Sequence, residues 1–216
     1  MVPIVTIDGP SGSGKGTISK HLALELGWNY LDSGLIYRCY AFLYSRKIEN
    51  IPIEIEKIQH NFSLESESII YEKKDITEFI RGSEITQLSS ELSQLEKVRS
   101  TLIKIQKTFR KPPGLIAEGR DMSSKLFPNS NLKIFLTADL DVRVERRANQ
   151  LSLSNKKVDI IKLRNAIEER DQMDSQRKNS PLIKTPDSIL IDTTSLSVRE
   201  TVEILIDLAR KHCPTT

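Results

Sequence analysis

A glycine-rich loop near the start of the chain carries the residues best suited to chemistry. The run "IDGPSGSGKGT", residues 7–17, places one lysine among four glycines, directly after a short apolar segment. Glycines let the backbone turn successive N–H groups toward an anion, and a helix that begins there adds a favourable dipole. The pattern therefore predicts a loop that binds the phosphates of a nucleoside triphosphate. The predicted phosphate-binding residues are Gly9, Pro10, Ser11, Gly12, Ser13, Gly14, Lys15, Gly16 and Thr17.

The residue after the lysine departs from the usual form of such a loop. Gly16 stands where Ser or Thr is expected, and the hydroxyl comes one position later, on Thr17. Lys15 can reach the β- and γ-phosphate oxygens as a point charge, and Thr17 is the candidate ligand for Mg²⁺. The alternative is a Gly/Ser-rich turn that binds nothing. A strand signal before the loop and a helix signal after it favour the phosphate-binding interpretation.

A phosphoryl-transfer enzyme also needs a second anion site, which holds the acceptor and neutralises its charge. Arginines suit this task, and three stretches offer them: Arg38 in "DSGLIYR", Arg120 in "EGRD", and the run "ERDQMDSQRKNSP". On a helix, Arg170, Asp174 and Arg177 of that run fall at i, i+4 and i+7 and share one face. A solvated, salt-bridged surface would explain this last pattern as well.

Short apolar runs alternate with helical stretches along the chain. Residues 3–8 form a strand-like run, and residues 15–26 have the character of a helix that Gly27 ends. A second helix is expected after Asp32 or Ser33, either of which can cap it. Further buried strands are expected at residues 115–119, 132–137 and 188–192. Strands that alternate with helices predict an α/β fold with a parallel sheet flanked by helices.

Residues 61–79 interrupt this order, because two short apolar clusters flank the polar "ESES". This pattern predicts a hairpin or small sheet, inserted in the α/β order as part of a substrate-binding lobe over residues 36–105. A surface hairpin without a role is the alternative. The core would then comprise residues 1–35, 106–148 and 166–216.

Charge, cysteine content and apolar runs predict the cellular location of the protein and the kinds of partner it has. The 216 residues carry 32 Lys and Arg against 29 Asp and Glu, without a block of like charge, so we expect no nucleic-acid partner. Cys39 and Cys213 have no metal-type spacing, and no apolar run approaches the length of a membrane span. With no signal-peptide pattern, these features predict a cytoplasmic protein without a membrane partner, and a monomer by default.

Six stretches together resemble the bacterial type of cytidylate kinase, a nucleoside monophosphate kinase with a P-loop. The Gly-Lys-Gly-Thr form of the loop is typical of these kinases, whereas GTPases have Gly-Lys-Ser/Thr. The combination of "DSG-x-IYR", "GRDM" and "RD-x-x-D-S-x-R-x-x-SPL" is more specific than the loop alone. The stretches, in order, are "GPSGSGKGT", "LDSGLIYR", "PGLIAEGRDM", "FP", "KIFLTA" and "ERDQMDSQRKNSPL".

The resemblance implies transfer of the γ-phosphate of ATP to CMP or dCMP with Mg²⁺. It also implies roles for residues that match the family's motifs. Lys15, Arg38, Arg120 and Arg177 would be catalytic, and Arg38 and Arg120 would bind the acceptor phosphate. The residues that match cytosine-binding positions are Ser33, Arg99, Asp121 and Arg177. The residues that match sugar-binding positions are Ser90, Arg170 and Asp174.

Three further expectations follow from the resemblance. A lid would lie at residues 149–165, where Lys156 and Lys157 flank a polar turn. Glu118 replaces an aspartate that related kinases often have, which changes how a metal-bound water would be held. Apolar spacing across residues 88–109 suits one continuous helix, but Ser90 and Arg99 would then lie about 180° apart. Since both are expected at one nucleotide, we predict a break near residues 94–97.

Two other interpretations stay open on the residues alone. A P-loop kinase for adenylate, shikimate or dephospho-coenzyme A would share the loop and the sheet. A nucleotide-dependent switch or binding module would bind ATP without acceptor-dependent turnover. Against a GTPase switch, the only near match to a guanine-reading motif is "NKKVD", which has Val158 where the aspartate belongs.

Overall fold

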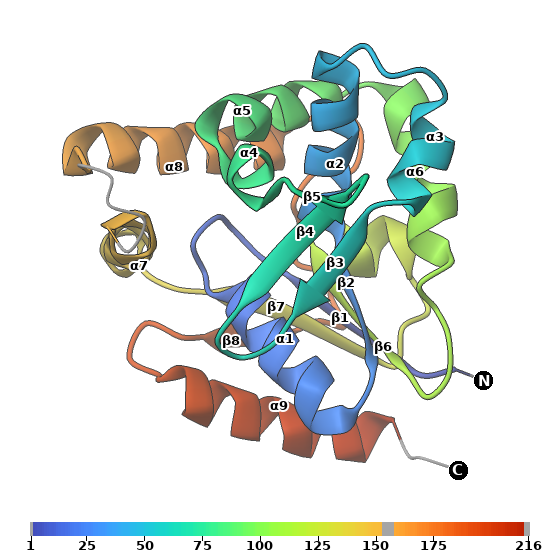
Figure 1. The fold of residues 1–216 in the computed structure, drawn as a ribbon. Coiled ribbons are helices and arrows are strands. Elements are labelled where there is room, and N and C mark those ends of the chain that lie inside the picture. The colour runs from blue at the N-terminus through green and yellow to red at the C-terminus, as the bar shows by residue number, and fades with distance from the viewer. Residues whose placement is uncertain (1, 153–157, 214–216) are drawn as a thin grey trace.

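A parallel sheet of five strands forms the centre of the computed structural model, which describes residues 2–152 and 158–213 (Figure 1). Every neighbouring pair of strands in this sheet is parallel. The α/β prediction is therefore confirmed. The strand order is β2 (Asn29–Asp32), β6 (Leu115–Gly119), β1 (Ile4–Asp8), β7 (Leu132–Thr137) and β8 (Ile189–Asp192).

Alternate residues of β1, β2 and β6 enter two different cores, one on each face of the sheet. Ile4 belongs to the core beneath α2 (Ser33–Ser45), whereas Val5 belongs to the core beneath α1 (Lys15–Leu26). The helix α9 (Val198–His212) packs beside α1 on that second face (Figure 1). The central strands β1 and β6 are buried at every position, including the polar Thr6, Asp8 and Glu118.

Local signals set the helix boundaries. Gly27 ends α1 with a left-handed φ of 63°, as expected for a C-terminal glycine. Asp32 caps α2, because its Oδ1 accepts a hydrogen bond from the Leu35 N–H at 2.7 Å. A capping box of Ser197 and Glu200 begins α9. These contacts satisfy N–H groups that would otherwise lack partners.

The small antiparallel sheet expected near residues 61–79 is present. In sequence it lies between β2 and β6 of the large sheet. Its strands are β3 (Gln59–Phe62), β4 (Glu67–Tyr71) and β5 (Lys74–Asp75). The helices around it are α3 (Ile51–Glu56), α4 (Thr77–Arg81), α5 (Ser83–Leu92) and α6 (Glu96–Lys107). The predicted insert boundaries at residues 36 and 105 fall inside α2 and α6, which are continuous helices. The insert therefore shares these two helices with the core.

The predicted helix break is confirmed, slightly earlier than expected. The helix α5 ends at Leu92 and α6 begins at Glu96, with Leu95 in an extended conformation between them. Ser93 stabilises the turn by donating its hydroxyl to the Ser90 carbonyl oxygen at 2.7 Å. The chain can thus direct Ser90 and Arg99 toward the same region.

Two further helices, α7 (Leu140–Ser152) and α8 (Ile160–Gln176), lie beside one end of the large sheet (Figure 1). The turn Met122–Leu126, a single π-helical turn, follows β6. Lys156 and Lys157, named for the expected lid, lie outside the described residues. Within residues 2–152 and 158–213, no helix combines the length and the apolar character that a bilayer span requires.

Both cysteines are free and buried, which leads to a test in solution. Burial raises the pKa of the Cys39 thiol to about 12 and that of Cys213 to about 11. Because only the thiolate reacts, we expect disulfide-exchange reagents at pH 8 to label the folded protein about 10²-fold or more slowly than free cysteine. Both thiols should react fully in guanidinium. Rapid labelling of either thiol in the native protein would contradict this burial.

Candidate active site

The glycine-rich loop connects the end of β1 to the start of α1, as predicted. Gly14 precedes α1 with a φ of 88°, a conformation that favours glycine. At Gly9, an added Cβ would lie 2.0 Å from the carbonyl oxygen of Leu136 on β7. The loop can therefore pass this close to the sheet only with glycine at that position.

Lys15 lies folded into the loop that it belongs to. Its Nζ donates to the Pro10 carbonyl oxygen at 2.8 Å and to Ser13 Oγ at 3.3 Å. Burial and the nearby Arg120 together lower the pKa of Lys15 to about 7, although Glu118, Asp174 and Asp8 act in the opposite direction. An anion bound at this loop would stabilise the charged form of the buried amine.

Two charged residues from α7 and α8 hold Ser11 of the loop through both of its backbone polar groups. Asp171 Oδ1 accepts from the Ser11 N–H at 2.9 Å, and Arg143 Nη1 donates to the Ser11 carbonyl oxygen at 2.8 Å. Arg143 and Asp171 also form an ion pair with each other. The loop is thereby tied to α8, the helix that carries Arg170 and Asp174.

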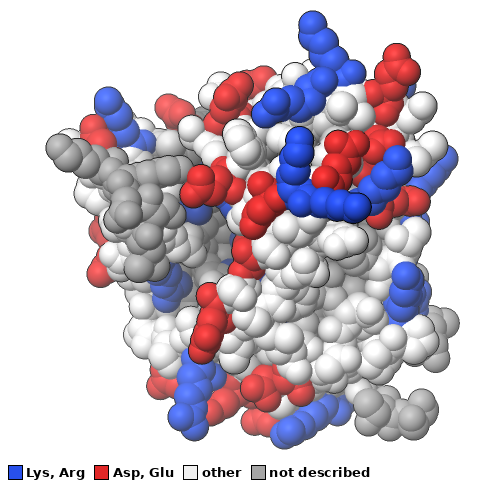
Figure 2. Space-filling view, in the orientation of Figure 1, with Lys and Arg blue, Asp and Glu red and all other residues white. Residues whose placement is uncertain are grey.

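A cavity beside the loop collects most of the residues predicted for the acceptor. Its free space is about 60 Å³, well below the ~300 Å³ of a small ligand pocket. A nucleotide would therefore have to displace the side chains that now meet across it. The predicted residues that line this cavity are Ser33, Ser90, Arg120, Asp121, Arg170, Asp174 and Arg177. On the face drawn in Figure 2, acidic side chains border a hollow in the surface that contains basic side chains.

Ion pairs cross this cavity, yet several guanidinium nitrogens remain without partners. Arg120 Nε donates to Asp174 Oδ2 at 2.6 Å, and Arg177 Nη1 lies 3.5 Å from the other carboxylate oxygen. Burial opposes ionisation of Asp174, but these two arginines outweigh it and hold its pKa below the ordinary value. Arg38 Nε, Arg170 Nε and Arg177 Nη2 are buried without a hydrogen-bond partner among the described residues. Unsatisfied cationic donors of this kind favour an anionic ligand.

The two remaining predicted residues lie next to the cavity. Arg99 forms a buried ion pair with Asp121, donates to the Ser93 carbonyl oxygen at 3.2 Å and lies 5.7 Å from the centre of the Tyr37 ring. Arg38 Nη2 lies 3.2 Å from Oδ2 of Asp32, the residue that precedes Ser33 in the sequence. Arg177 follows the last residue of α8 rather than lying on the helix, but it still reaches the cavity. All of the predicted acceptor residues are thus brought together.

Gly16 lies close to the carboxylate of Glu118. A Cβ added at Gly16 would lie 3.2 Å from Glu118 Oε1, so the carboxylate would have to shift slightly to relieve the contact. Glu118 stands at the end of β6 and accepts a hydrogen bond from the Tyr30 hydroxyl at 3.1 Å. Thr17, one position further, is exposed at the start of α1.

Several charged residues of the site were not predicted. Arg143 lies in none of the quoted motifs, and Asp171 lies in "RD-x-x-D-S-x-R" but was given no role there. Arg81 approaches Asp32 at 3.7 Å from the inserted region, which no local pattern indicates. Only the arrangement of the strands places these side chains near the loop.

Comparison with known proteins decides the family. The profile of the cytidylate kinase family matches residues 5–211. The chain belongs to this family. The cytidylate kinase of Stutzerimonas stutzeri (strain A1501) is 41% identical over 215 residues, which cover 95% of this chain and 94% of that relative. The cytidylate kinase of Methylococcus capsulatus is 39% identical over 218 residues, or 98% of each chain. This member of the family is accordingly a kinase that phosphorylates nucleoside monophosphates.

Solved structures share the fold at much lower identity. A protein of Eubacterium ventriosum superposes with a TM-score of 0.54 at 14% identity, covering 95% of this chain and 97% of that one. A gluconokinase of Sinorhizobium meliloti superposes with a TM-score of 0.50 at 14% identity, covering 97% and 93%. These structures share the fold and support no more specific conclusion.

Proposed function

We propose that this kinase transfers the γ-phosphoryl group of ATP to CMP and dCMP, forming CDP and dCDP. The observation that carries the proposal is the acceptor cavity, where unpartnered guanidinium nitrogens lie beside the buried Arg99–Asp121 pair. An anionic ligand with a polar base would satisfy these groups. A flat polar base also fits a cavity bordered by the hydroxyls of Ser33 and Ser90.

Cytosine has a hydrogen-bonding edge that matches the residues proposed for it. Its amino group would donate to Asp121, while its O2 and N3 acceptors would receive hydrogen bonds from Arg99 and Arg177. Ser33 would complete this set. UMP presents a carbonyl oxygen where CMP has the amino group, so it would meet the carboxylate of Asp121 with the wrong polarity.

The sugar and phosphate of the acceptor would use the arginines nearer the loop. Ser90, Arg170 and Asp174 are proposed to bind the sugar hydroxyls, and Arg38 and Arg120 the phosphate. Because Arg120 now pairs with Asp174, acceptor binding would exchange that carboxylate for a phosphate oxygen. The exchange keeps each buried charge paired.

ATP is proposed to bind through residues 9–17, with Lys15 turning from Pro10 toward the β- and γ-phosphates. Burial and the nearby Asp32 raise the pKa of Glu118, so a divalent cation would suit this end of β6. Mg²⁺ keeps several waters and relies largely on substrate phosphates, which fits one hydroxyl from Thr17 and a water held by Glu118. When bound, the ion would neutralise phosphate charge that develops during transfer.

The chemistry proposed for the chain is positioning and electrostatic stabilisation. Lys15, Arg38, Arg120 and Arg177 would surround the transferring group, so the acceptor phosphate oxygen attacks in line without a nucleophile from the protein. The region 36–105 is proposed as the acceptor lobe, and residues 149–165 as a lid that excludes water.

A coupled assay of ADP release tests this function. With ATP and Mg²⁺, we expect turnover to be fastest with CMP or dCMP in a panel that also contains UMP, AMP and shikimate. Arg177→Ala should lower kcat/KM for CMP about 10²-fold, because it removes a proposed base and phosphate contact. Lys178→Ala is the matched control, since Lys178 is the exposed neighbour of Arg177.

The panel also separates the alternatives. Turnover with AMP or shikimate but not with CMP would overturn the proposed acceptor. ATP binding without turnover of any acceptor would indicate a binding module. An Arg177→Ala variant as active as the Lys178→Ala control would remove Arg177 from the site.

A further inference from the structure

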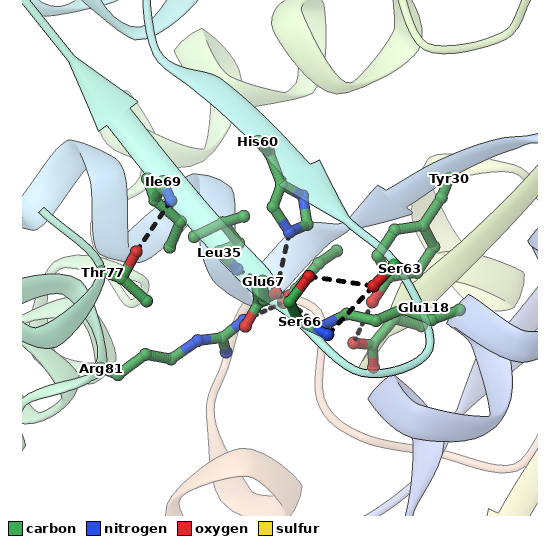
Figure 3. Close-up of polar contacts among 12 residues, drawn as sticks. Tyr30, Leu35, His60, Ser63, Ser66, Glu67, Ile69, Thr77, Arg81 and Glu118 are labelled. Atoms are coloured by element: carbon green, nitrogen blue, oxygen red, sulfur yellow. Dashed lines mark hydrogen bonds and ion pairs between the residues drawn. The ribbon is translucent and has the colours of Figure 1, made fainter. Parts of the chain in front are cut away.

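Glu67 on β4 binds three cationic or polar groups from three different elements. Its Oε1 accepts hydrogen bonds from Lys20 Nζ on α1 and from Arg81 Nη2 on α4, both at 2.6 Å. His60 Nε2 on β3 lies 2.8 Å from the same oxygen, and Arg81 Nη2 also donates to Oε2 at 2.7 Å. Figure 3 shows Glu67 between His60 and Arg81. The small sheet is thus bonded to the helix that follows the phosphate loop.

Arg81 continues from this carboxylate toward the acceptor site. Its Nη2 lies 3.7 Å from Asp32 Oδ2, the oxygen that accepts a hydrogen bond from Arg38 Nη2 at 3.2 Å. Charges therefore alternate along Glu67, Arg81, Asp32 and Arg38. The Asp32 and Arg38 side chains are 7% and 12% exposed, so their interaction is only partly screened by solvent.

Two cations compete for one carboxylate oxygen at the end of this series. Asp32 also caps α2 through the Leu35 N–H, which fixes the position of its carboxylate. By sharing the negative charge of Asp32, Arg81 weakens the attraction of Asp32 for Arg38. Arg38 Nε is buried without a hydrogen-bond partner among the described residues, and its positive charge is available for an anion. Glu67 in turn fixes the position of Arg81.

We infer that Arg81 is a positioning residue for acceptor binding, which acts through Asp32 on Arg38 and is itself held by Glu67. The small antiparallel sheet, in this view, supplies the carboxylate that keeps Arg81 at Asp32. The inference rests on the proposed function, because it takes Arg38 as a ligand of the acceptor phosphate. It adds residues to the site that have no motif in the sequence.

Steady-state kinetics with both substrates varied independently test this role. We expect Arg81→Gln to raise KM for CMP about tenfold while KM for ATP stays within about twofold. Glu67→Gln should shift KM for CMP in the same direction by a smaller factor, because Arg81 remains but is no longer held. Arg81→Lys should recover part of the loss, since it restores the charge near Asp32 without the planar fork.

Two comparisons separate positioning from a general loss of structure. Glu65→Gln makes the same chemical change at an exposed position of the same hairpin and should leave both KM values unchanged. Because Glu67 and Arg81 act in series, the double variant should be no worse in acceptor KM than Arg81→Gln alone. Calorimetric titration of CMP without ATP should show the same loss of acceptor affinity.

Three results would overturn the inference. These are an unchanged acceptor KM in Arg81→Gln, a parallel rise of both KM values with a lower melting temperature, or no recovery in Arg81→Lys. Preference of the natural protein for a monophosphate other than CMP would overturn the proposed function instead. In that case, the effect of Arg81→Gln on KM for that monophosphate, compared with its effect on KM for ATP, would still test the role of Arg81.

Discussion

Lys15→Met is expected to lower kcat by about 10³-fold, the largest catalytic effect of a single substitution in this chain. Lys15 is the one residue among positions 9–17 with a charged side chain, and it is proposed to contact the β- and γ-phosphates. Methionine keeps the unbranched shape but removes the charge that would stabilise the transferring group. Single-turnover measurements with ATP and CMP would show whether the chemical step is slowed.

The stability of the Lys15→Met variant provides the control. The Lys15 amine is buried, and burial together with Arg120 lowers its pKa to about 7, so the charged form is disfavoured. The variant should consequently melt at the same or a higher temperature without nucleotide. Lys107→Met, on the exposed side of α6, should change neither property. A variant with normal kcat, or one that loses activity only by unfolding, would contradict the role of Lys15.

Asp121→Leu is expected to reduce the free energy of unfolding by about 3 kcal/mol, because it leaves the Arg99 guanidinium buried without its carboxylate. The same substitution should lower kcat/KM for CMP by about 10²-fold, since it removes the proposed acceptor for the cytosine amino group. Chemical denaturation and steady-state kinetics measure the two effects separately.

A double variant distinguishes the structural effect from the functional one. Arg99→Met combined with Asp121→Leu replaces both charges by apolar groups and should recover most of the lost stability. It should not recover CMP turnover, because neither partner of cytosine is restored. Asp141→Leu, in an exposed ion pair with Arg164, is the matched control and should have little effect on stability. Full CMP turnover by the double variant would show that Asp121 has only a structural role.

Many residues of the candidate site could be proposed from short motifs in the sequence. The break between α5 and α6 is one example of a structural feature predicted from such residues. The family resemblance implies that Ser90 and Arg99 bind one nucleotide, and one straight helix would direct them apart, so an interruption could be predicted. The structure places it at residues 93–95, where α5 ends and α6 begins. The run from Arg170 to Arg177 was ambiguous in sequence. Its Arg170, Asp174 and Arg177 side chains line the acceptor cavity, which no local pattern could establish.

The sequence did not predict which groups the charged side chains of the site would bind. Arg143 and Asp171 bind Ser11 across 132 and 160 residues of sequence, and Arg81 meets Asp32 from beyond the small sheet. Each of these contacts depends on which strands are neighbours. A motif in the sequence carries no information on this point when the residues lie on different elements.

The sequence by itself determined the phosphate loop, the helix boundaries and the α/β class, because these depend on interactions within a few residues. Glycine torsions, side-chain caps and the alternation of apolar residues act locally. Only the tertiary structure placed the carboxylate of Glu118 beside Gly16, because Glu118 lies on a strand more than a hundred residues later. It likewise decided which carboxylate each arginine meets, because long-range electrostatic contacts form only after the strand order has brought distant elements together.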